Sequence, residues 1–514
     1  MKANIKIVVG SVGLAFACTG VAAPVALTTE YQENPVGIDA EQPRLAWKLG
    51  ADVVRQRTYQ LETDGVAQPE VASADQIGVA WPGVRLTTGS RHAWRVRVRD
   101  EKGSLSDWSE PASFVVGKRD AWRAEWIGNG FDRQPAFEKR FAVTGKVVRA
   151  TLFITAPGYY EAQLNGRKVG DKVLDPSPTA YDKRVLYSTY DLKGDLKRGE
   201  NELLILLGHG WYDNRAVATW NFEVAPWRDF PRTIAQLDIA YADGTKETVA
   251  TDASWRQVAN PVVYDDVYEG EVLDGRVRAG AELPGGPLMA VEVDGPRGRL
   301  VPEEQPGAKV MKEVRASAVH PLGDGACLIE FPVNVAGWMR LPLYGQKSGD
   351  VVSFRYDERA NADGTPAVDS VRDGLHDKGS GAQRETRSVD HHFRYTASHR
   401  FCAKDAAFQC DRYICRGEDG ETYEPRFSYK GFRYVLVRGL ARLPKAEDAV
   451  ARFVHTAADD GGTLEWLWQE RADLSRGQVR RCSLRVNKDA YDGAALSGFP
   501  LLVRVSPERY CTVT

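Results

Sequence analysis

The dipeptide Asn165-Gly166 constrains the fold of this chain more than any other feature, because it joins two strand-like runs, Tyr159–Leu164 and Arg167–Val173. Both residues accept the positive φ angles of a two-residue type I′ turn, which matches the twist of paired antiparallel strands. The runs therefore predict a β-hairpin. Helical patterns are scarce and are confined to Ala446–Arg452 and part of the last 49 residues, so we expect an all-β protein.

A second β signature is the strict alternation of apolar residues and arginine from Trp94 to Arg99. Alternation of this kind buries one face of a strand and leaves the other wet, as in an antiparallel sandwich. A strand signal at Tyr59–Glu62 and a turn at Asp100–Gly103 complete the pattern. We predict a first sandwich over residues 26–117, similar to a fibronectin type III module.

Further strand signals predict another β-sandwich over residues 299–455. The runs Gly337–Leu343 and Val351–Tyr356 are separated by a glycine-containing turn, and Gly431–Val437 is a third run of the same kind. With 514 residues and 43% hydrophobic residues, the chain has the length of three or four domains and can bury several cores.

The formal charge of the chain is −2, and no basic stripe interleaved with aromatic residues is present. Nucleic acid is therefore not expected as a partner. Neutral polar molecules are the natural ligands for such a composition.

The amino terminus has the pattern of a signal peptide over residues 1–23. Lys2 and Lys6 precede the apolar run Ile7–Ala17, and small residues follow at Gly20–Ala23. The apolar run is shorter than the roughly 20 residues that span a bilayer, so no stable membrane span is expected. We predict export to the periplasm or beyond the cell.

Cysteine and histidine spacing gives no metal motif. Once Cys18 leaves with the signal peptide, the remaining cysteines are Cys327, Cys402, Cys410, Cys415, Cys482 and Cys511. One disulfide among Cys402, Cys410 and Cys415 is an alternative, but buried free thiols are the favoured interpretation. His391-His392 and His399 lack a suitably spaced third ligand, because neighbours in a strand point to opposite faces.

Several motifs follow one another in the middle of the chain. They are GYYE from Gly158, NGRKVG from Asn165, TAYDKRVLY from Thr179, GHGWY from Gly208 and YEGEVLDGR from Tyr268. In this order they resemble the amino-terminal region of bacterial α-L-rhamnosidases, and the resemblance covers roughly residues 35–465. It implies a jelly-roll, carbohydrate-binding-like domain over 118–287 and a concanavalin-like sandwich over 299–455.

The resemblance also implies a ligand, because in some family members the jelly-roll binds terminal L-rhamnose with the help of a calcium ion. Sugar binding needs aromatic rings against C–H faces, together with amides, carboxylates and arginine for the hydroxyl groups. Our candidate residues are Tyr159, Asn165, Trp211, Tyr212, Asp213, Asn214 and Arg215. Core packing of Trp211 and Tyr212 and a turn role for Asn165 remain alternatives.

An acidic segment, Tyr264–Glu271 with Asp274 close by, is the first place to look for glycosidase carboxylates. Glu269 and Glu271 would share one face of a strand at a spacing that distance alone does not exclude. The family, however, places its acid and base in a helical (α/α)6 barrel that follows the sandwiches. We therefore assign no catalytic residue here.

Residues 466–514 do not match that barrel, and we expect an irregular tail, read out of frame after about Glu465. The family reaction is hydrolysis of terminal non-reducing α-L-rhamnose. For this chain we expect retained accessory sugar-binding modules of a truncated family member, which could work with a separately encoded catalytic domain. The alternatives are a non-catalytic glycan-binding protein and a decayed, inactive fragment.

Overall fold

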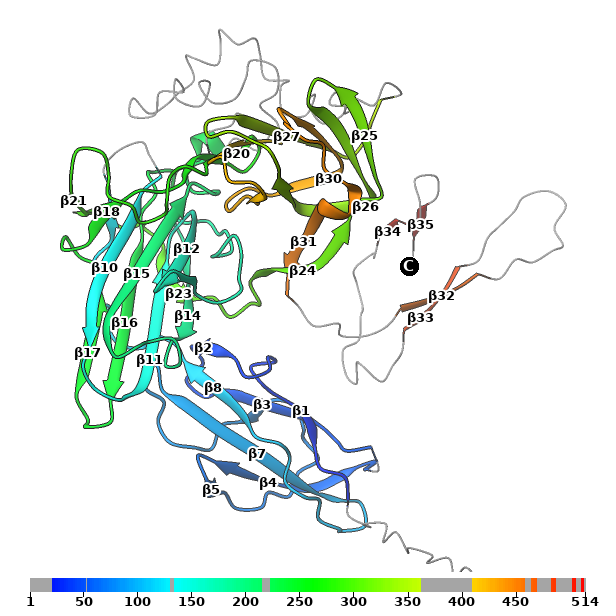
Figure 1. Cartoon of the computed structure of the whole chain (residues 1–514). Coiled ribbons are helices and arrows are strands. Elements are labelled where there is room, and N and C mark those ends of the chain that lie inside the picture. Colours follow the sequence, from blue (N-terminus) through cyan, green and yellow to red (C-terminus); the bar gives the residue numbers. More distant parts are fainter. Residues whose placement is uncertain are drawn as a thin grey trace, which may run out of the picture. The chain divides into compact units, whose positions relative to one another are not determined.

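The computed structural model describes residues 21–51, 53–129, 134–214, 222–361 and 409–457, and the backbone of four short strands beyond them. In these residues the secondary structure is β throughout, apart from the short 3₁₀ turns η1 (Phe222–Val224) and η3 (Ala446–Asp448) (Figure 1). The chain divides into two units, residues 1–456 and 457–514. The all-β prediction is confirmed. Most of the predicted signal peptide, through residue 20, lies outside the described residues.

The first sandwich consists of two sheets. One contains β1 (Val25–Thr29), β3 (Arg44–Lys48) and β6 (Val79–Ala80), and the other runs β2 (Val36–Ile38), β8 (Ala112–Val116), β7 (Arg91–Asp100), β4 (Gln56–Thr63) and β5 (Val66–Ala67). The alternation predicted in β7 is confirmed, with Trp94, Val96 and Val98 buried in the core. On the outer face, the guanidinium groups of Arg95 and Arg97 lie 5.0 and 4.6 Å from the ring of Trp108.

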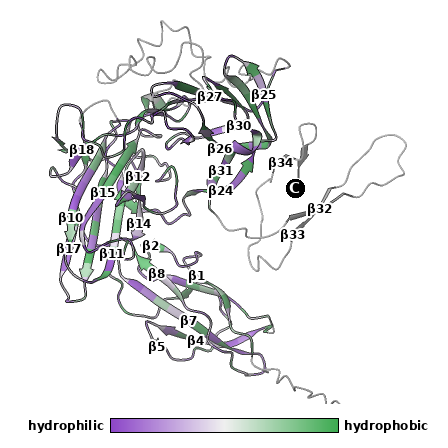
Figure 2. Cartoon of the chain, viewed as in Figure 1, coloured by the Kyte–Doolittle hydropathy of each residue, from purple (hydrophilic) through white to green (hydrophobic). Residues whose placement is uncertain are grey.

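The second sandwich pairs a six-stranded with a five-stranded sheet. The first runs β13 (Arg167–Lys168), β12 (Tyr159–Leu164), β15 (Gly199–Gly208), β10 (Ala136–Val143), β18 (Arg256–Val258) and β21 (Leu288–Met289). The second runs β17 (Lys246–Ala250), β16 (Ile234–Tyr241), β11 (Val147–Thr155), β14 (Arg184–Asp191) and β23 (Arg299–Pro302). A short pair, β9 (Ile127–Gly128) with β22 (Val291–Glu292), lies beside them. Apolar residues of β15 and β11 fill the core between the sheets, and β15 is largely hydrophobic in Figure 2.

The predicted hairpin is present at β12 and β13. Asn165 and Gly166 have φ angles of 54° and 77°, as a type I′ turn requires. The second strand ends at Lys168 rather than Val173, because Gly170 adopts a φ of 67° and lies against the ring of Tyr190. The predicted length of that strand was therefore wrong.

The third sandwich is built around a long sheet. Its order is β19 (Val262–Asp266), β20 (Gly270–Asp274), β28 (Cys410–Ile414), β27 (Val351–Asp357), β30 (Lys430–Arg438), β26 (Ala326–Leu343), β31 (Val450–Thr456) and β24 (Ala308–Arg315). β25 (Ala318–Gly323) and β29 (Glu421–Tyr423) also pair with β26. The hairpin β19–β20 precedes this sandwich in sequence but extends its sheet, since β20 pairs in parallel with β28. The acidic segment therefore joins the second and third sandwiches.

The predicted helix at Ala446–Arg452 was wrong beyond its first residues. Only η3 is helical, and β31 begins at Val450. Pairing of β31 with both β24 and β26 overrides the local helical preference.

In the second unit, β32 (Leu464–Trp468) pairs with β33 (Cys482–Val486), and β34 (Leu502–Arg504) with β35 (Tyr510–Thr512). Cys327, Cys410 and Cys415 are free, buried thiols, whereas Cys402 and the three histidines from His391 to His399 lie outside the described residues. Within the described part of the chain, no helix is long and apolar enough to cross a membrane.

Candidate functional site

A buried polar cluster lies where β15 ends and β19 ends. His209, directly after β15, donates its backbone N–H to Asp265 Oδ2 at 2.8 Å, and its Nδ1 lies 3.0 Å from Asp265 Oδ1. Gln134 Nε2 donates to the same carboxylate at 3.1 Å. The Asp265 carboxylate favours the His209 tautomer with the proton on Nδ1, although Gln134 Nε2 also lies 3.0 Å from that nitrogen. His209 Nε2 is then left as an acceptor.

Asp213 and Asn214 continue the cluster, and both side chains are fully buried. Arg228 Nε donates to Asp213 Oδ1 at 3.0 Å, and Asn214 Nδ2 donates to Asp266 Oδ2 at 3.3 Å. Asp213 Oδ2 faces His209 Nε2 at 3.5 Å. The cluster therefore combines three carboxylates with an imidazole, an amide and a guanidinium group.

Three buried polar atoms have no hydrogen-bond partner here: His209 Nε2, Asn214 Oδ1 and Trp227 Nε1. The hydroxyl of Tyr181, whose ring packs against Tyr212 and Trp227, is a fourth such atom nearby. Buried polar groups are almost always satisfied, because an unmade hydrogen bond costs about 1–3 kcal/mol. Two acceptors and one donor left open in one region thus indicate a place for the hydroxyl groups of a ligand.

Aromatic rings surround the cluster. Trp211 meets Phe222 and Tyr268 edge to face, with ring centroids 5.0 and 5.5 Å apart, and all three are only half-buried. Tyr212 is buried and packs against Tyr181 at 5.3 Å. Trp211 can therefore present apolar surface at the rim of the cluster. Tyr212 is a core residue, which agrees with the core-packing alternative in the sequence analysis.

The structure brings together some of the predicted site residues and separates others. Trp211, Asp213 and Asn214 belong to the cluster. Tyr159 lies at the same end of β12, opposite Gly208, but it is buried against Phe427, and burial raises its pKa well above the usual value.

Asn165 lies at the opposite end of β12, roughly 20 Å away at the usual rise of a strand. Its amide binds Asn201 Oδ1 and the backbone N–H of Glu202, so it serves the turn. Arg215 lies outside the described residues.

Sequence reasoning missed His209, Asp265, Gln134 and Arg228. His209 stands inside the GHGWY motif, next to the aromatic pair Trp211-Tyr212. Asp265 belongs to the acidic segment, whose sequence pattern indicates catalysis rather than sugar binding. His209 and Asp265 meet only where the end of β15 approaches β19, and no local pattern in the sequence encodes that contact.

The two glutamates of the acidic segment do not share one face of a strand. Glu269 lies in the turn between β19 and β20, and Tyr264 OH donates to it. Glu271 is fully buried and accepts the backbone N–H groups of Arg426 and Phe427 at 2.8–3.1 Å. The expected spacing was wrong, because the strand is broken by the turn. The observed arrangement makes Glu271 an anchor between two sandwiches.

The residue types of the cluster suit calcium, because Asp213 and Asn214 supply oxygen ligands and Asn214 Oδ1 is buried without a hydrogen-bond partner. The described residues supply only part of the six or more oxygens that calcium takes, and among them no group of three His, Cys, Asp or Glu side chains is arranged to hold a metal ion.

Comparison with known proteins assigns each sandwich. Residues 24–120 match the N-terminal immunoglobulin domain of Rha78A-like proteins. Residues 145–312 match the α-L-rhamnosidase N-terminal domain, and residues 320–455 the bacterial α-L-rhamnosidase concanavalin-like domain.

Curated relatives extend the match. An α-L-rhamnosidase of Formosa agariphila is 27% identical over 84% of this chain and 48% of its own length. One from Streptomyces avermitilis is 33% identical over 61% of this chain and 27% of its own length. The chain thus spans about half, or less, of the length of these relatives.

Solved structures agree. The α-L-rhamnosidase from Dictyoglumus thermophilum aligns with a TM-score of 0.72 and 27% identity over 88% of this chain and 50% of its own. A Streptomyces avermitilis α-L-rhamnosidase complexed with L-rhamnose aligns with a TM-score of 0.72 and 23% identity over 87% of this chain and 58% of its own. The chain therefore carries the immunoglobulin-like, N-terminal and concanavalin-like β-sandwich modules of α-L-rhamnosidases.

Proposed function

We propose that the cluster around His209 and Asn214 binds a terminal L-rhamnose residue, and that these modules hold rhamnose-containing glycans for α-L-rhamnoside hydrolysis. The observation that carries the proposal is the set of three buried, unbonded polar atoms: His209 Nε2, Asn214 Oδ1 and Trp227 Nε1. The relative solved with L-rhamnose supports the choice of sugar.

Each group has a role in this proposal. Sugar hydroxyls donate to His209 Nε2 and Asn214 Oδ1 and accept from Trp227 Nε1. The ring of Trp211 packs against a C–H face of the sugar at the half-buried rim. Arg228 holds Asp213 in place from the side opposite His209.

Calcium forms part of the proposal, with Asp213 and Asn214 as the residues that would hold it. A bound calcium ion would supply a positive charge to which sugar hydroxyls coordinate. The histidine and the tryptophans bind the sugar in the same way with or without the ion.

Cleavage of the glycosidic bond is proposed for the family's barrel and not for these sandwiches. Glu271 is bound by two backbone N–H groups and is closed to substrate. We also propose that the protein is exported, on the pattern of Lys2, Lys6 and the apolar run that follows.

Calorimetric titration of the purified chain with L-rhamnose tests the proposal, with D-mannose as the comparison sugar. We expect binding of L-rhamnose, at least a tenfold loss in Asn214→Ala, and no effect of Asn165→Gly, because Asn165 serves only the distant turn. A chromogenic α-L-rhamnoside should remain uncleaved. Equal binding by wild type and Asn214→Ala would overturn the site, and rapid cleavage would overturn the accessory role.

A further inference from the structure

A cleft of about 950 Å³ lies between the immunoglobulin-like sandwich and the outer face of the second sandwich. This volume falls within the range of ligand pockets, roughly 300–1,000 Å³. Trp81, Leu86 and Thr88 line one wall, and Asp238 and Lys246 line the other. The cleft is separate from the cluster around His209.

The floor is the outward face of the sheet β17-β16-β11. Successive residues of a strand point to opposite faces. Leu237 and Ile239 of β16 are in the core, so Asp238 points outward, and its cross-strand partner Thr248 shares that face. Arg149 enters the cleft from β11, next to Ala240 of β16.

Contacts between the two sandwiches fix the walls. Tyr187 OH of β14 accepts the backbone N–H of Lys118 at 2.9 Å. Gly89, with a φ of 66°, turns so closely over β11 that a Cβ there would lie 2.9 Å from Thr151 Oγ1. Arg91 forms an ion pair with Asp191 at 2.7 Å.

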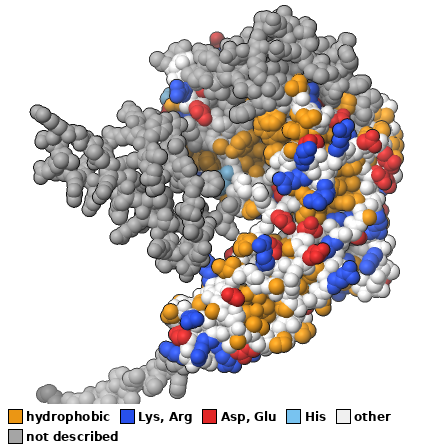
Figure 3. All heavy atoms as spheres, turned by 180° about the vertical axis from the view of Figure 1, so that it is seen from behind, with side chains coloured by type: hydrophobic (Ala, Val, Ile, Leu, Met, Phe, Trp, Pro, Cys, Tyr) orange, Lys and Arg blue, Asp and Glu red, His pale blue; other side chains and the backbone are white. Residues whose placement is uncertain are grey.

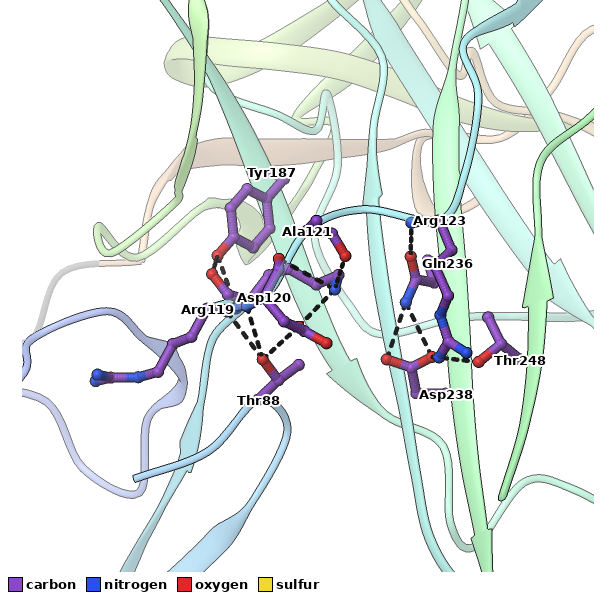
Figure 4. A network of polar contacts seen from close by, with 10 residues as sticks. Thr88, Arg119, Asp120, Ala121, Arg123, Tyr187, Gln236, Asp238 and Thr248 are labelled. Carbon is purple, nitrogen blue, oxygen red and sulfur yellow. Dashed lines mark hydrogen bonds and ion pairs between the residues drawn. The ribbon is translucent and has the colours of Figure 1, made fainter. Parts of the chain in front are cut away.

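Two of the acidic side chains in the cleft are neutralised by their own networks (Figure 4). Asp120 is bound by Lys118 Nζ at 2.7 Å and by Thr88 Oγ1. Asp238 accepts from Arg123 at 2.9 Å, from Gln236 at 2.9 Å and from Thr248 at 2.8 Å.

Several cations of the cleft lack such a partner. Arg119 extends away from the Asp120 network in Figure 4, and its guanidinium donates only to the backbone oxygens of Asp39 and Ala40. Its Nε is buried without a hydrogen-bond partner. Among the residues that the structure describes, no carboxylate forms an ion pair with Arg119, Arg149 or Lys246.

Glu41 and Glu247 also line the cleft, so its cationic excess is small, and it is local. On the face that Figure 3 shows, Lys and Arg side chains are interspersed with Asp and Glu, and the whole chain carries a charge of only −2. Apolar side chains, including the exposed Val84, lie beside the unpaired cations in the cleft. Positive charge next to apolar surface in a cleft of this size matches a sugar that carries a carboxylate.

We propose that this cleft binds an acidic oligosaccharide, with a uronate carboxylate held by Arg119, Arg149 and Lys246. The saccharide class rests on the proposed glycan-binding function, whereas the preference for negative charge rests on the cleft alone. The chain would then hold two parts of one glycan: a terminal neutral sugar in the second sandwich and an acidic unit beside the first.

The test is calorimetric titration of the full chain at low salt with tri-galacturonate, with its fully methyl-esterified form, and with inorganic phosphate. We expect tri-galacturonate to bind and the neutral ester to bind at least tenfold more weakly. Phosphate should also bind far more weakly, because it has no sugar face. Equal binding of ester and acid, or of phosphate and acid, would overturn the proposal, as would no binding of the acid.

Variants localise the effect. Arg149→Ala and Lys246→Ala should each weaken tri-galacturonate binding by about tenfold, as expected for one charge-assisted contact. Arg167→Ala, an exposed arginine of β13 outside the cleft, is the matched control and should bind as wild type. Unchanged affinity in both cleft variants would refute the assignment. L-rhamnose titration of Arg149→Ala separates the two proposals, since it should match wild type whether or not the cleft binds acid.

Discussion

The second sandwich contains two buried polar clusters that differ in how completely they are satisfied. In the first, Asp175 accepts from Ser188 at 2.9 Å and from Tyr190 at 2.7 Å, while Lys172 binds Glu303. In the second, around His209 and Asn214, three polar atoms have no partner. Burial of polar groups therefore does not by itself mark a site. The unmade hydrogen bonds of the second cluster make it the better candidate for ligand binding, because a bound molecule could supply the missing partners.

The motifs that resemble the rhamnosidases are divided between these two clusters. Tyr160 of the GYYE motif donates to Asp175 and so belongs to the closed network. His209 of the GHGWY motif belongs to the open one. Two motifs that resemble the family equally well thus belong to different clusters, one with its hydrogen bonds made and one in which we propose that a ligand binds.

The largest expected effect comes from breaking the closed network with Lys172→Met. This variant leaves the buried carboxylates of Asp175 and Glu303 without their cation, and we expect a loss of about 3–5 kcal/mol in unfolding free energy. Urea unfolding followed by fluorescence measures it. Lys168→Met, at an exposed position of β13, is the control and should cost less than about 0.5 kcal/mol. A similar small cost for Lys172→Met would remove the contrast between the clusters.

In the cluster around His209 and Asn214, Trp227→Phe should change ligand affinity rather than stability. The change deletes a buried N–H that has no partner, so we expect a stability loss of no more than about 1 kcal/mol. Affinity for L-rhamnose should fall by about tenfold, because the donor for a sugar hydroxyl is gone. Calorimetry and urea unfolding on the same sample measure both. A large loss of stability with normal affinity would make Trp227 a structural residue.

Another buried acidic group, Glu271, should make the unfolding free energy depend on pH. Burial, followed by the nearby charge of Asp411, raises the pKa of Glu271 to about 8, although the N–H groups of Arg426 and Phe427 oppose the shift. The native state thus holds its proton to higher pH than the unfolded chain, whose Glu pKa is about 4.3. The stabilisation by protonated Glu271 is complete below a pH of about 4.3. It is lost as the pH rises towards 8, by up to about 1.4 kcal/mol per pH unit.

Glu271→Gln should flatten this slope between pH 5 and 8, because the amide does not titrate. Urea midpoints at several pH values for wild type and variant provide the measurement. An identical slope in both proteins would show that Glu271 is ionised in the native state at pH 5.

Calcium removal is expected to have the smallest effect. Dialysis against a chelator should lower L-rhamnose affinity several-fold, and calcium, but not magnesium, should restore it, because calcium accepts the larger and more flexible oxygen shell. An L-rhamnose affinity that is the same before and after chelation would show that calcium takes no part in binding.

Local patterns predicted much of the fold. The alternation in β7 and the Asn165-Gly166 turn are encoded by neighbouring residues and were found where expected. The strand at Val450 was missed, because its two partners, β24 and β26, lie far away in the sequence. The sequence predicted Trp211, Asp213 and Asn214 as candidate residues, but not which atoms are left unbonded. That property depends on the approach of β19 to the end of β15, which only the folded chain shows.

A crystal structure of the chain soaked with L-rhamnose would show directly whether the cluster around His209 and Asn214 binds the sugar. We expect one sugar beside Trp211, with hydroxyl groups within hydrogen-bond distance of Asn214 Oδ1, His209 Nε2 and Trp227 Nε1. Sugar density bound elsewhere, with these three atoms still unpartnered, would contradict it.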